Sequence, residues 1–153
     1  MNKKDIRIKI TGIDYSPNEE GGEGETGLPE ITEYITEAEY VSGDSSEIIY
    51  RESEELGMGD TTVKICWKEE TPNVVSVMRS GEVGTVMTFE TGKRHISSYS
   101  MPGMSFELCT RALRVSNDFD GQRGEIFLDY IIEIRGTFGG RRRMIIEALP
   151  IMA

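Results

Sequence analysis

The chain has 153 residues, of which 37% are hydrophobic and 29% are charged, and its formal net charge is −10. This composition excludes a disordered chain, and no apolar stretch approaches the roughly 20 residues that a membrane-crossing helix needs. The acidic balance also argues against a dedicated nucleic-acid binder and against binding to anionic membrane surfaces. We therefore expect one globular domain over residues 1–153, with no nucleic-acid or membrane partner.

The first predicted element is a strand that starts near Lys3. In it Ile6, Ile8 and Ile10 alternate with basic residues, and a period of two is typical of a strand with one buried face. The N-terminus has no continuous apolar run of the kind found in signal peptides. We therefore expect a cytoplasmic protein.

The segment at 16–27 follows this strand and differs from the rest of the chain. It is acidic and Gly-rich and contains no hydrophobic residue other than Pro17. Such a stretch has nothing to bury, so we predict a mobile loop. Its glutamates are irregularly spaced, which favours a solvated loop over a calcium site.

The remaining elements are also predicted to be strands. Val63, Ile65 and Trp67 share one face of such a run, and the clearest alternation covers residues 125–135. Gly, Pro, Asn and Asp clusters separate the runs, as in β-turns. The ten predicted strands start near Lys3, Glu30, Glu47, Asp60, Asn73, Val83, Lys93, Ser105, Gly124 and Arg141.

Short strands joined by tight turns predict an all-β fold in which sequential neighbours pair. A long antiparallel meander has two open edges unless it closes on itself. We therefore predict a small closed barrel of eight to ten strands. A Greek-key sandwich is the alternative architecture.

Residues for catalysis or metal binding are few. His95 is the only histidine, and no local signature of a nucleophile accompanies it, so we predict a surface histidine on a strand. Cys66 and Cys109 are far apart in sequence and are expected to stay reduced in the cytoplasm. Two cysteines and one histidine are too few for a usual zinc site. We predict no catalytic residue, metal or cofactor, and favour a binding role over catalysis.

The one basic cluster is Arg141–Arg143, which follows the Gly-rich residues 136–140. Three arginines at a hairpin tip could clamp phosphates or RNA. The glycines are explained more simply by the positive φ angles of a tight hairpin, and charged residues at a strand end block edge pairing. Because the chain is acidic, we favour the structural interpretation.

A polar set on the predicted strands is a candidate for a ligand site. Alternation places Arg79 on the same face as Val75 and Val77, and an interior arginine beside the Tyr99 hydroxyl could clamp a carboxylate or phosphate. The alternative is that Arg79 flanks a turn or forms a structural ion pair with Glu52. The tentative ligand-binding residues are Arg79, Tyr99 and Glu52.

An ordered series of residues in the middle of the chain resembles a known family. The series runs from Arg79-Ser80-Gly81 through Met87-Thr88-Phe89, Gly92, Tyr99 and Pro102 to Phe106-Glu107-Leu108, and Ile48–Glu52 resembles an earlier strand of the same family. This pattern, over roughly residues 47–149, resembles the YwiB-like family of bacterial proteins, a domain of unknown function. The chain departs from the family at residues 101–104, where Thr-Pro-Tyr-Gly is usual.

The resemblance implies a lipocalin-like (calycin) barrel whose interior could hold a small ligand, and it implies no activity. Two functions follow as expectations. One is a cytoplasmic barrel that binds a small anionic or apolar ligand in its interior. The other is a structural or protein-interaction module with a filled barrel and no ligand. A shared fold does not decide between them.

Overall fold

The computed structural model describes residues 2–15, 28–52, 61–81 and 84–150, so the predicted loop at 16–27 lies outside the described residues. The described part is all-β, as predicted. Its strands are β1 (Asn2–Asp14), β2 (Glu30–Ser42), β3 (Ser45–Glu52), β4 (Thr61–Lys68), β5 (Thr71–Ser80), β6 (Gly84–Phe89), β7 (Arg94–Met101), β8 (Met104–Asn117), β9 (Glu125–Ile134) and β10 (Thr137–Leu149).

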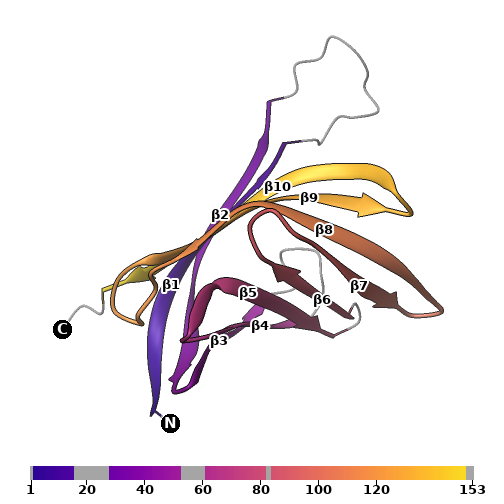
Figure 1. The fold of residues 1–153 in the computed structure, drawn as a ribbon. Helices are drawn as coiled ribbons and strands as arrows, with labels where there is room; N and C mark the ends of the chain where they lie inside the picture. Colours follow the sequence, from indigo (N-terminus) through magenta and orange to yellow (C-terminus); the bar gives the residue numbers. More distant parts are fainter. Residues whose placement is uncertain (1, 16–27, 53–60, 82–83, 151–153) are drawn as a thin grey trace.

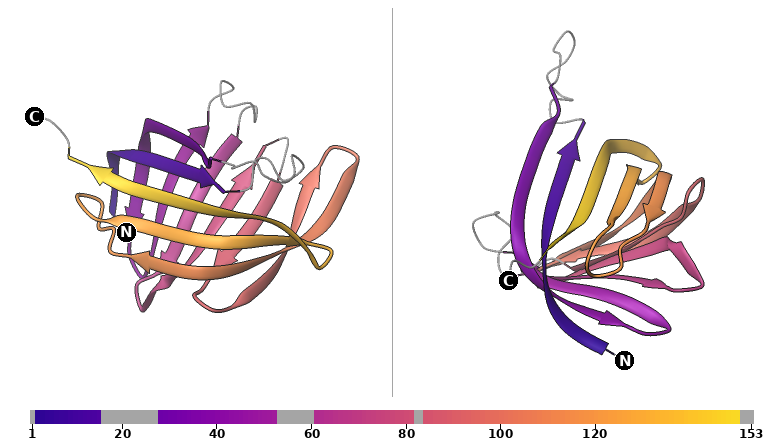
Figure 2. Two further views of the ribbon diagram at one scale, coloured as in Figure 1. Left: turned by 90° about the horizontal axis from the view of Figure 1, so that it is seen from above. Right: turned by 90° about the vertical axis from the view of Figure 1, so that its left-hand side faces the viewer.

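The ten strands form one closed antiparallel barrel (Figures 1 and 2). Each strand pairs with its neighbours in sequence, and β1 closes the barrel against β10 with Arg7 opposite Leu149 and Asp14 opposite Arg142. Closure leaves neither the first nor the last strand as an open edge. The predicted meander is confirmed, and the Greek-key alternative is excluded.

The core lies on the inward faces that alternation predicted. Ile6, Ile8 and Ile10 are buried on β1, as are Val63, Ile65 and Trp67 on β4. The same rule holds on β9, where the buried residues of the inward face are Ile126, Leu128, Tyr130 and Ile132. Every second residue points inward because successive side chains of a strand project to opposite faces.

An aromatic plug of Tyr40, Trp67 and Phe119 fills one end of the barrel. The ring of Phe119, from the connection between β8 and β9, lies 5.7 Å from Tyr40 and 6.1 Å from Trp67 between centroids. All three residues are buried. Their buried rings occupy the interior at this end, which leaves the opposite end for an interior site.

The β9–β10 hairpin differs from the sequence-based expectation. Its tight turn is formed by Arg135 and Gly136, both with positive φ, as a two-residue hairpin loop requires. The strand β10 starts at Thr137 rather than near Arg141, and a β-bulge between Phe138 and Gly140 lies within the ladder. Of the glycines in 136–140 that were expected to form the hairpin turn, Gly136 does so, whereas Gly139 and Gly140 lie in the bulge.

The arginines of β10 consequently lie inside a strand and not at a hairpin tip. Arg143 is opposite Asp129, and β10 pairs with both β1 and β9, so the predicted role in blocking an edge was wrong. Arg141 donates two hydrogen bonds to the Asp129 carboxylate, at 3.0 and 2.8 Å, and Arg143 donates one at 3.0 Å. The side chains of Asp129, Arg141 and Arg143 form a clamp on the outer face of the sheet.

This clamp makes a prediction for acid stability. Hydrogen bonds from Arg141, followed by those from Arg143, hold the pKa of Asp129 below its usual value. The clamp therefore stabilises the fold fully above the ordinary pKa near 3.8 and loses that contribution as the pH falls through the lowered value. We expect Asp129→Asn to cost about 1–3 kcal/mol at pH 7, measured by urea unfolding.

The pH profile distinguishes this effect from a general loss of packing. The difference between the wild type and Asp129→Asn should shrink when unfolding is repeated at pH values below 4, because the wild type then loses the charged clamp. Glu133→Gln is the matched control, since Glu133 pairs with the exposed Arg94 and should cost less than about 1 kcal/mol. A constant difference at every pH would contradict the charged clamp.

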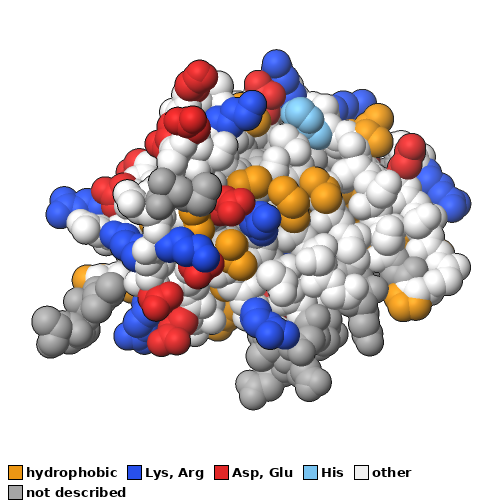
Figure 3. Space-filling view, turned by 90° about the horizontal axis from the view of Figure 1, so that it is seen from below, with side chains coloured by type: hydrophobic (Ala, Val, Ile, Leu, Met, Phe, Trp, Pro, Cys, Tyr) orange, Lys and Arg blue, Asp and Glu red, His pale blue; other side chains and the backbone are white. Residues whose placement is uncertain are grey.

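The outer surface carries both charges. Figure 3 shows one face on which acidic and basic side chains surround a group of exposed hydrophobic side chains. Exposed hydrophobic residues of the described chain include Val86 and Ile96 on the neighbouring strands β6 and β7. Within the described residues, no helix has the length and apolar character needed to cross a membrane.

Candidate functional site

A pocket of about 370 Å³ lies at the barrel end opposite the aromatic plug. Its walls come from the ends of strands that meet there, among them the end of β1, the start of β2 and the first half of β10. A larger hollow of about 760 Å³ lies on the surface near the β8–β9 connection, and none of its lining residues is buried. Only the first of these two hollows reaches buried polar side chains.

The strand register sets the polar wall of this pocket. Arg79 on β5 is opposite Thr85 on β6, and Thr85 is opposite Tyr99 on β7. Residues opposite each other in an antiparallel pair project to the same face at close spacing. One lateral row of the barrel therefore places Arg79, Thr85 and Tyr99 side by side, although they are far apart in sequence.

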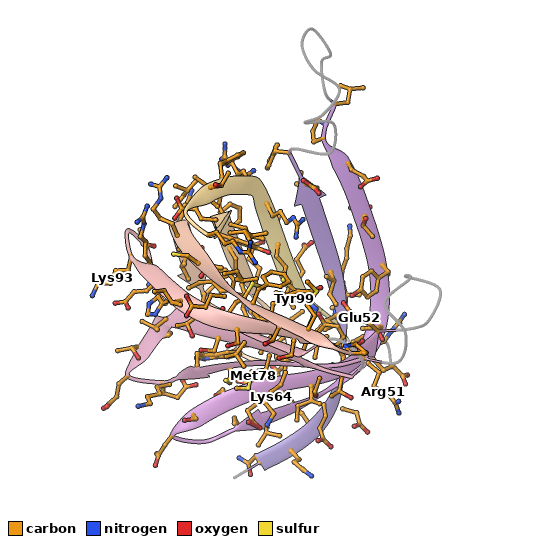
Figure 4. All side chains as sticks on the ribbon, turned by 90° about the vertical axis from the view of Figure 1, so that its right-hand side faces the viewer. Arg51, Glu52, Lys64, Met78, Lys93 and Tyr99 are labelled. Atoms are coloured by element: carbon orange, nitrogen blue, oxygen red, sulfur yellow. The ribbon has the colours of Figure 1, made fainter. Side chains whose placement is uncertain are left out.

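Glu52 and Arg79 form a buried ion pair at this wall. Arg79 Nε lies 3.5 Å from Glu52 Oε1, and the side chains are only 19% and 8% exposed, respectively. The Tyr34 hydroxyl donates a long hydrogen bond of 3.4 Å to Glu52 Oε2. Figure 4 shows Glu52 and Tyr99, which both line the pocket, whereas Arg51, the residue beside Glu52, is exposed.

The polar groups of this wall are incompletely paired. The buried atoms Arg79 Nε, Glu52 Oε1 and Thr85 Oγ1 have no hydrogen-bond partner of good geometry within the described part of the chain, and neither does the Tyr50 hydroxyl. Buried polar groups are almost always hydrogen-bonded, and each exception calls for a physical reason. A bound molecule with acceptor and donor atoms would provide the partners.

Burial controls the ionisation of this cluster. It raises the pKa of Tyr34 to about 12, with the nearby Glu52 carboxylate adding to the effect, and it is the largest cause that raises the pKa of Tyr50 and of Tyr130. Burial lowers the pKa of the Arg79 guanidinium, but the nearby Glu52, Tyr50 and Tyr130 outweigh this effect, so that the pKa is raised. At neutral pH the wall therefore presents the Arg79 cation in its ion pair with Glu52, together with the neutral phenols of Tyr34 and Tyr130, which can donate hydrogen bonds.

The rest of the pocket is apolar inside and charged at its rim. Arg142 lies 3.7 Å from Asp14, and Arg143 is held by Asp129, so the two rim arginines already have acidic partners. The apolar lining residues include Ile10, Met87, Leu108, Ile132 and Met144. A predominantly apolar cavity with a few polar groups on one wall is typical of a small-molecule site.

The structure brings the three predicted ligand-binding residues together. Arg79, Tyr99 and Glu52 all line the pocket, and Arg79 shares the inward face with the buried Val75 and Val77, as alternation predicted. Tyr99 also faces the interior and stacks on Phe106 at 5.0 Å, but no hydrogen bond joins it to Arg79 or Glu52 among the described residues. Their role in binding stays a prediction.

Sequence reasoning did not assign Tyr34 and Thr85 to the site. Both occupy inward positions in runs that alternate, and Thr85 has the parity of the buried Met87 and Phe89. A polar residue at an inward position was the available signal. This signal locates the site only when the register between strands is known, and the register depends on the lengths of the connections and on bulges.

The residues considered for catalysis and metal binding are not assembled into a reactive centre. His95 Nε2 lies 3.6 Å from Glu90 Oε1 at the start of β7, and its side chain is one-third exposed. Cys66 and Cys109 are both unpaired thiols on half-buried positions. The described residues contain no group of three or more His, Cys, Asp or Glu side chains placed to hold a metal ion.

Comparisons with known proteins agree with this architecture. The chain is 32% identical over 109 residues to a Bacillus subtilis (strain 168) protein named "Uncharacterized beta-barrel protein YwiB". The aligned residues make up 71% of this chain and 73% of that protein. The crystal structure of the ywiB protein from Bacillus subtilis superposes with a TM-score of 0.76 at 24% identity, over 98% of this chain and 94% of that chain. The structural match supports the fold alone.

The family match extends over nearly the whole barrel. Residues 8–146 match the family described as Domain of unknown function (DUF1934), a range that runs from β1 into β10. The resemblance inferred from the residues between 47 and 149 is therefore confirmed. Together with the 32% sequence identity to the YwiB protein, this match shows that the chain belongs to the DUF1934 family of β-barrel proteins.

Proposed function

We propose that the barrel binds a small amphipathic molecule whose anionic head, a carboxylate or phosphate, meets Arg79 and whose apolar body fills the pocket. The observation that carries this function is the Arg79 guanidinium, which is largely buried at the pocket wall and has one ion-pair contact, at 3.5 Å, with Glu52. A guanidinium has five N–H donors in a planar fork that matches a carboxylate or phosphate.

The shape of the interior supports a ligand over a filled barrel. The aromatic plug closes one end, whereas about 370 Å³ is left at the other end, within the range of pockets that hold small ligands. The apolar lining would contribute affinity in proportion to the area that the ligand buries. A protein-interaction module with a filled interior would have no need of this space or of the polar wall.

The arrangement of polar groups suggests how the ligand would be oriented. The head would accept hydrogen bonds from Arg79 and from the hydroxyls of Thr85 and Tyr99, all of which line the pocket. Glu52 would hold the guanidinium in place from its other side. We place this binding in the cytoplasm, where Cys66 and Cys109 would stay reduced.

The test compares two probes that differ in the head group alone. In titration calorimetry, decanoate should bind the wild type more tightly than decanol does. Arg79→Met should weaken decanoate by about 30-fold or more, which corresponds to 2 kcal/mol, while decanol stays within about threefold. Arg7→Met, which removes an exposed arginine from the outer face of β1, is the matched control and should change neither probe.

A second variant keeps the test decisive if Arg79→Met folds poorly. Arg79→Met/Glu52→Met removes both charges of the pair, so neither is left alone in the interior. Decanoate should then bind no better than decanol does. If decanoate binds neither the wild type nor the control, or binds the variants as tightly as it binds the wild type, the proposed function is wrong.

A further inference from the structure

The outer face of β8, β9 and β10 carries a second cluster of arginines, and of these only Arg143 also reaches the rim of the pocket. The register places Arg111 and Arg141 on either side of Ile131, and places Arg114 and Arg143 on either side of Asp129. These four arginines surround Asp129, and the five residues, here called the arginine face, carry a net charge of +3 on a chain whose net charge is −10. Glu125 and Glu133 lie beyond them on the same side of β9. A concentration of positive charge on an acidic protein calls for a partner.

Aromatic rings are interleaved with these arginines. The guanidinium carbons of Arg114 and Arg143 lie 5.2 and 5.0 Å from the centroid of the Phe127 ring. Those of Arg141 and Arg143 lie 5.0 and 5.5 Å from the centroid of Tyr15. Contacts within about 6 Å of the centroid are attractive, and they hold the guanidinium groups in fixed positions across the sheet.

Donors on this face have no partner within the described part of the chain. The buried Nε atoms of Arg111 and Arg143 lack a hydrogen-bond acceptor, and Arg114 is exposed beside them. Asp129 accepts three hydrogen bonds, and all three come from Arg141 and Arg143 on one flanking strand. The arginines of β8, Arg111 and Arg114, are therefore available to an external anion.

We propose that the arginine face binds single-stranded nucleic acid. Its phosphates would pair with Arg111, Arg114 and Arg143, and its bases would stack on the ordered guanidinium planes and on the partly exposed rings of Tyr15 and Phe127. Positively charged surfaces with interleaved aromatic rings bind single strands in this way. Carboxylates of an acidic polypeptide would use the charge but not the stacking surface, so the nucleic acid is favoured.

The test measures binding of a fluorescein-labelled twelve-residue oligouridylate by anisotropy. The wild type should bind at 50 mM salt with a micromolar dissociation constant, and the affinity should fall steeply by 200 mM salt. Arg111→Gln/Arg114→Gln should weaken binding about tenfold or more and reduce the slope of log K against log salt by about 1.4, because each lost phosphate contact on a single strand contributes about 0.7.

Two further variants are expected to behave differently from Arg111→Gln/Arg114→Gln. Asp129→Asn removes the only acidic group within the arginine face and should strengthen binding, whereas Arg7→Gln on the outer face of β1 should leave it unchanged. The proposal is overturned if the wild type shows no binding at 50 mM salt. It is also overturned if polyglutamate displaces the oligonucleotide as effectively as unlabelled oligouridylate does, because the face would then recognise charge alone. Arg111 and Arg114 do not line the pocket, so the effect of their substitution does not depend on ligand binding there.

Discussion

Replacing Arg79 with Met is expected to lower the free energy of unfolding by about 3–5 kcal/mol at neutral pH. Glu52 is 8% exposed and lies 3.5 Å from Arg79, and its second oxygen has a long contact with Tyr34. Removal of the guanidinium would leave the carboxylate in the interior with a phenol as its remaining partner. A buried charge without a counter-ion is among the most destabilising features of a folded chain.

A double-mutant cycle separates this penalty from the loss of packing. Arg79→Met/Glu52→Met should recover most of the lost stability, since methionines of similar length leave no charge unpaired. Urea unfolding followed by the fluorescence of Trp67 measures all four proteins of the cycle. If the Arg79→Met chain is as stable as the wild type, the carboxylate does not depend on Arg79 and the buried pair is wrongly described.

The second large effect is expected at Phe89, on the inward face of β6. The ring is 1% exposed and lies 4.6 Å from that of Tyr130 between centroids, and Tyr130 lines the pocket. Phe89→Ala would remove the buried ring and leave a cavity that neighbouring strands can fill only in part. We expect a loss of about 3–5 kcal/mol in the free energy of unfolding.

Phe138 provides a matched control for this substitution. It lies on β10 and is 55% exposed, so Phe138→Ala should change the free energy of unfolding by less than about 1 kcal/mol. Phe89→Leu should fall between the two alanine variants, because it retains part of the buried volume. Equal losses for Phe89→Ala and Phe138→Ala would show that Phe89 is not a core residue.

The fold could be predicted from the sequence because alternation reports burial directly. Ile8 and Ile65 are buried where the period of two places them, and tight turns between the runs favour pairing of sequential neighbours. The exception is the last hairpin, where Gly139 and Gly140 suggest a turn. Arg135 and Gly136 form the turn instead, and a glycine pair alone does not distinguish a turn from a bulge.

The candidate site could be predicted only in part. Arg79 could be identified from the sequence because it is a charged residue among inward-facing valines. Burying a charge costs free energy, so such a residue needs a partner or a function. Thr85 and Tyr34 are uncharged and give a weaker signal at their inward positions, and their place beside Arg79 and Glu52 depends on the register between strands. Arg141 and Arg143 were visible as a cluster, but their clamp on Asp129 requires a residue from another strand.

The most direct test of the central claim observes the Arg79 guanidinium itself during ligand binding. Its Nε–Hε cross-peak in a ¹H–¹⁵N NMR spectrum can be assigned by its absence from the spectrum of Arg79→Met. On titration with decanoate, this cross-peak should shift and saturate with the dissociation constant that calorimetry gives, and decanol should leave it nearly unchanged. If decanoate binds and saturates while the Arg79 cross-peak does not move, the head of the ligand does not meet Arg79 and the account is contradicted.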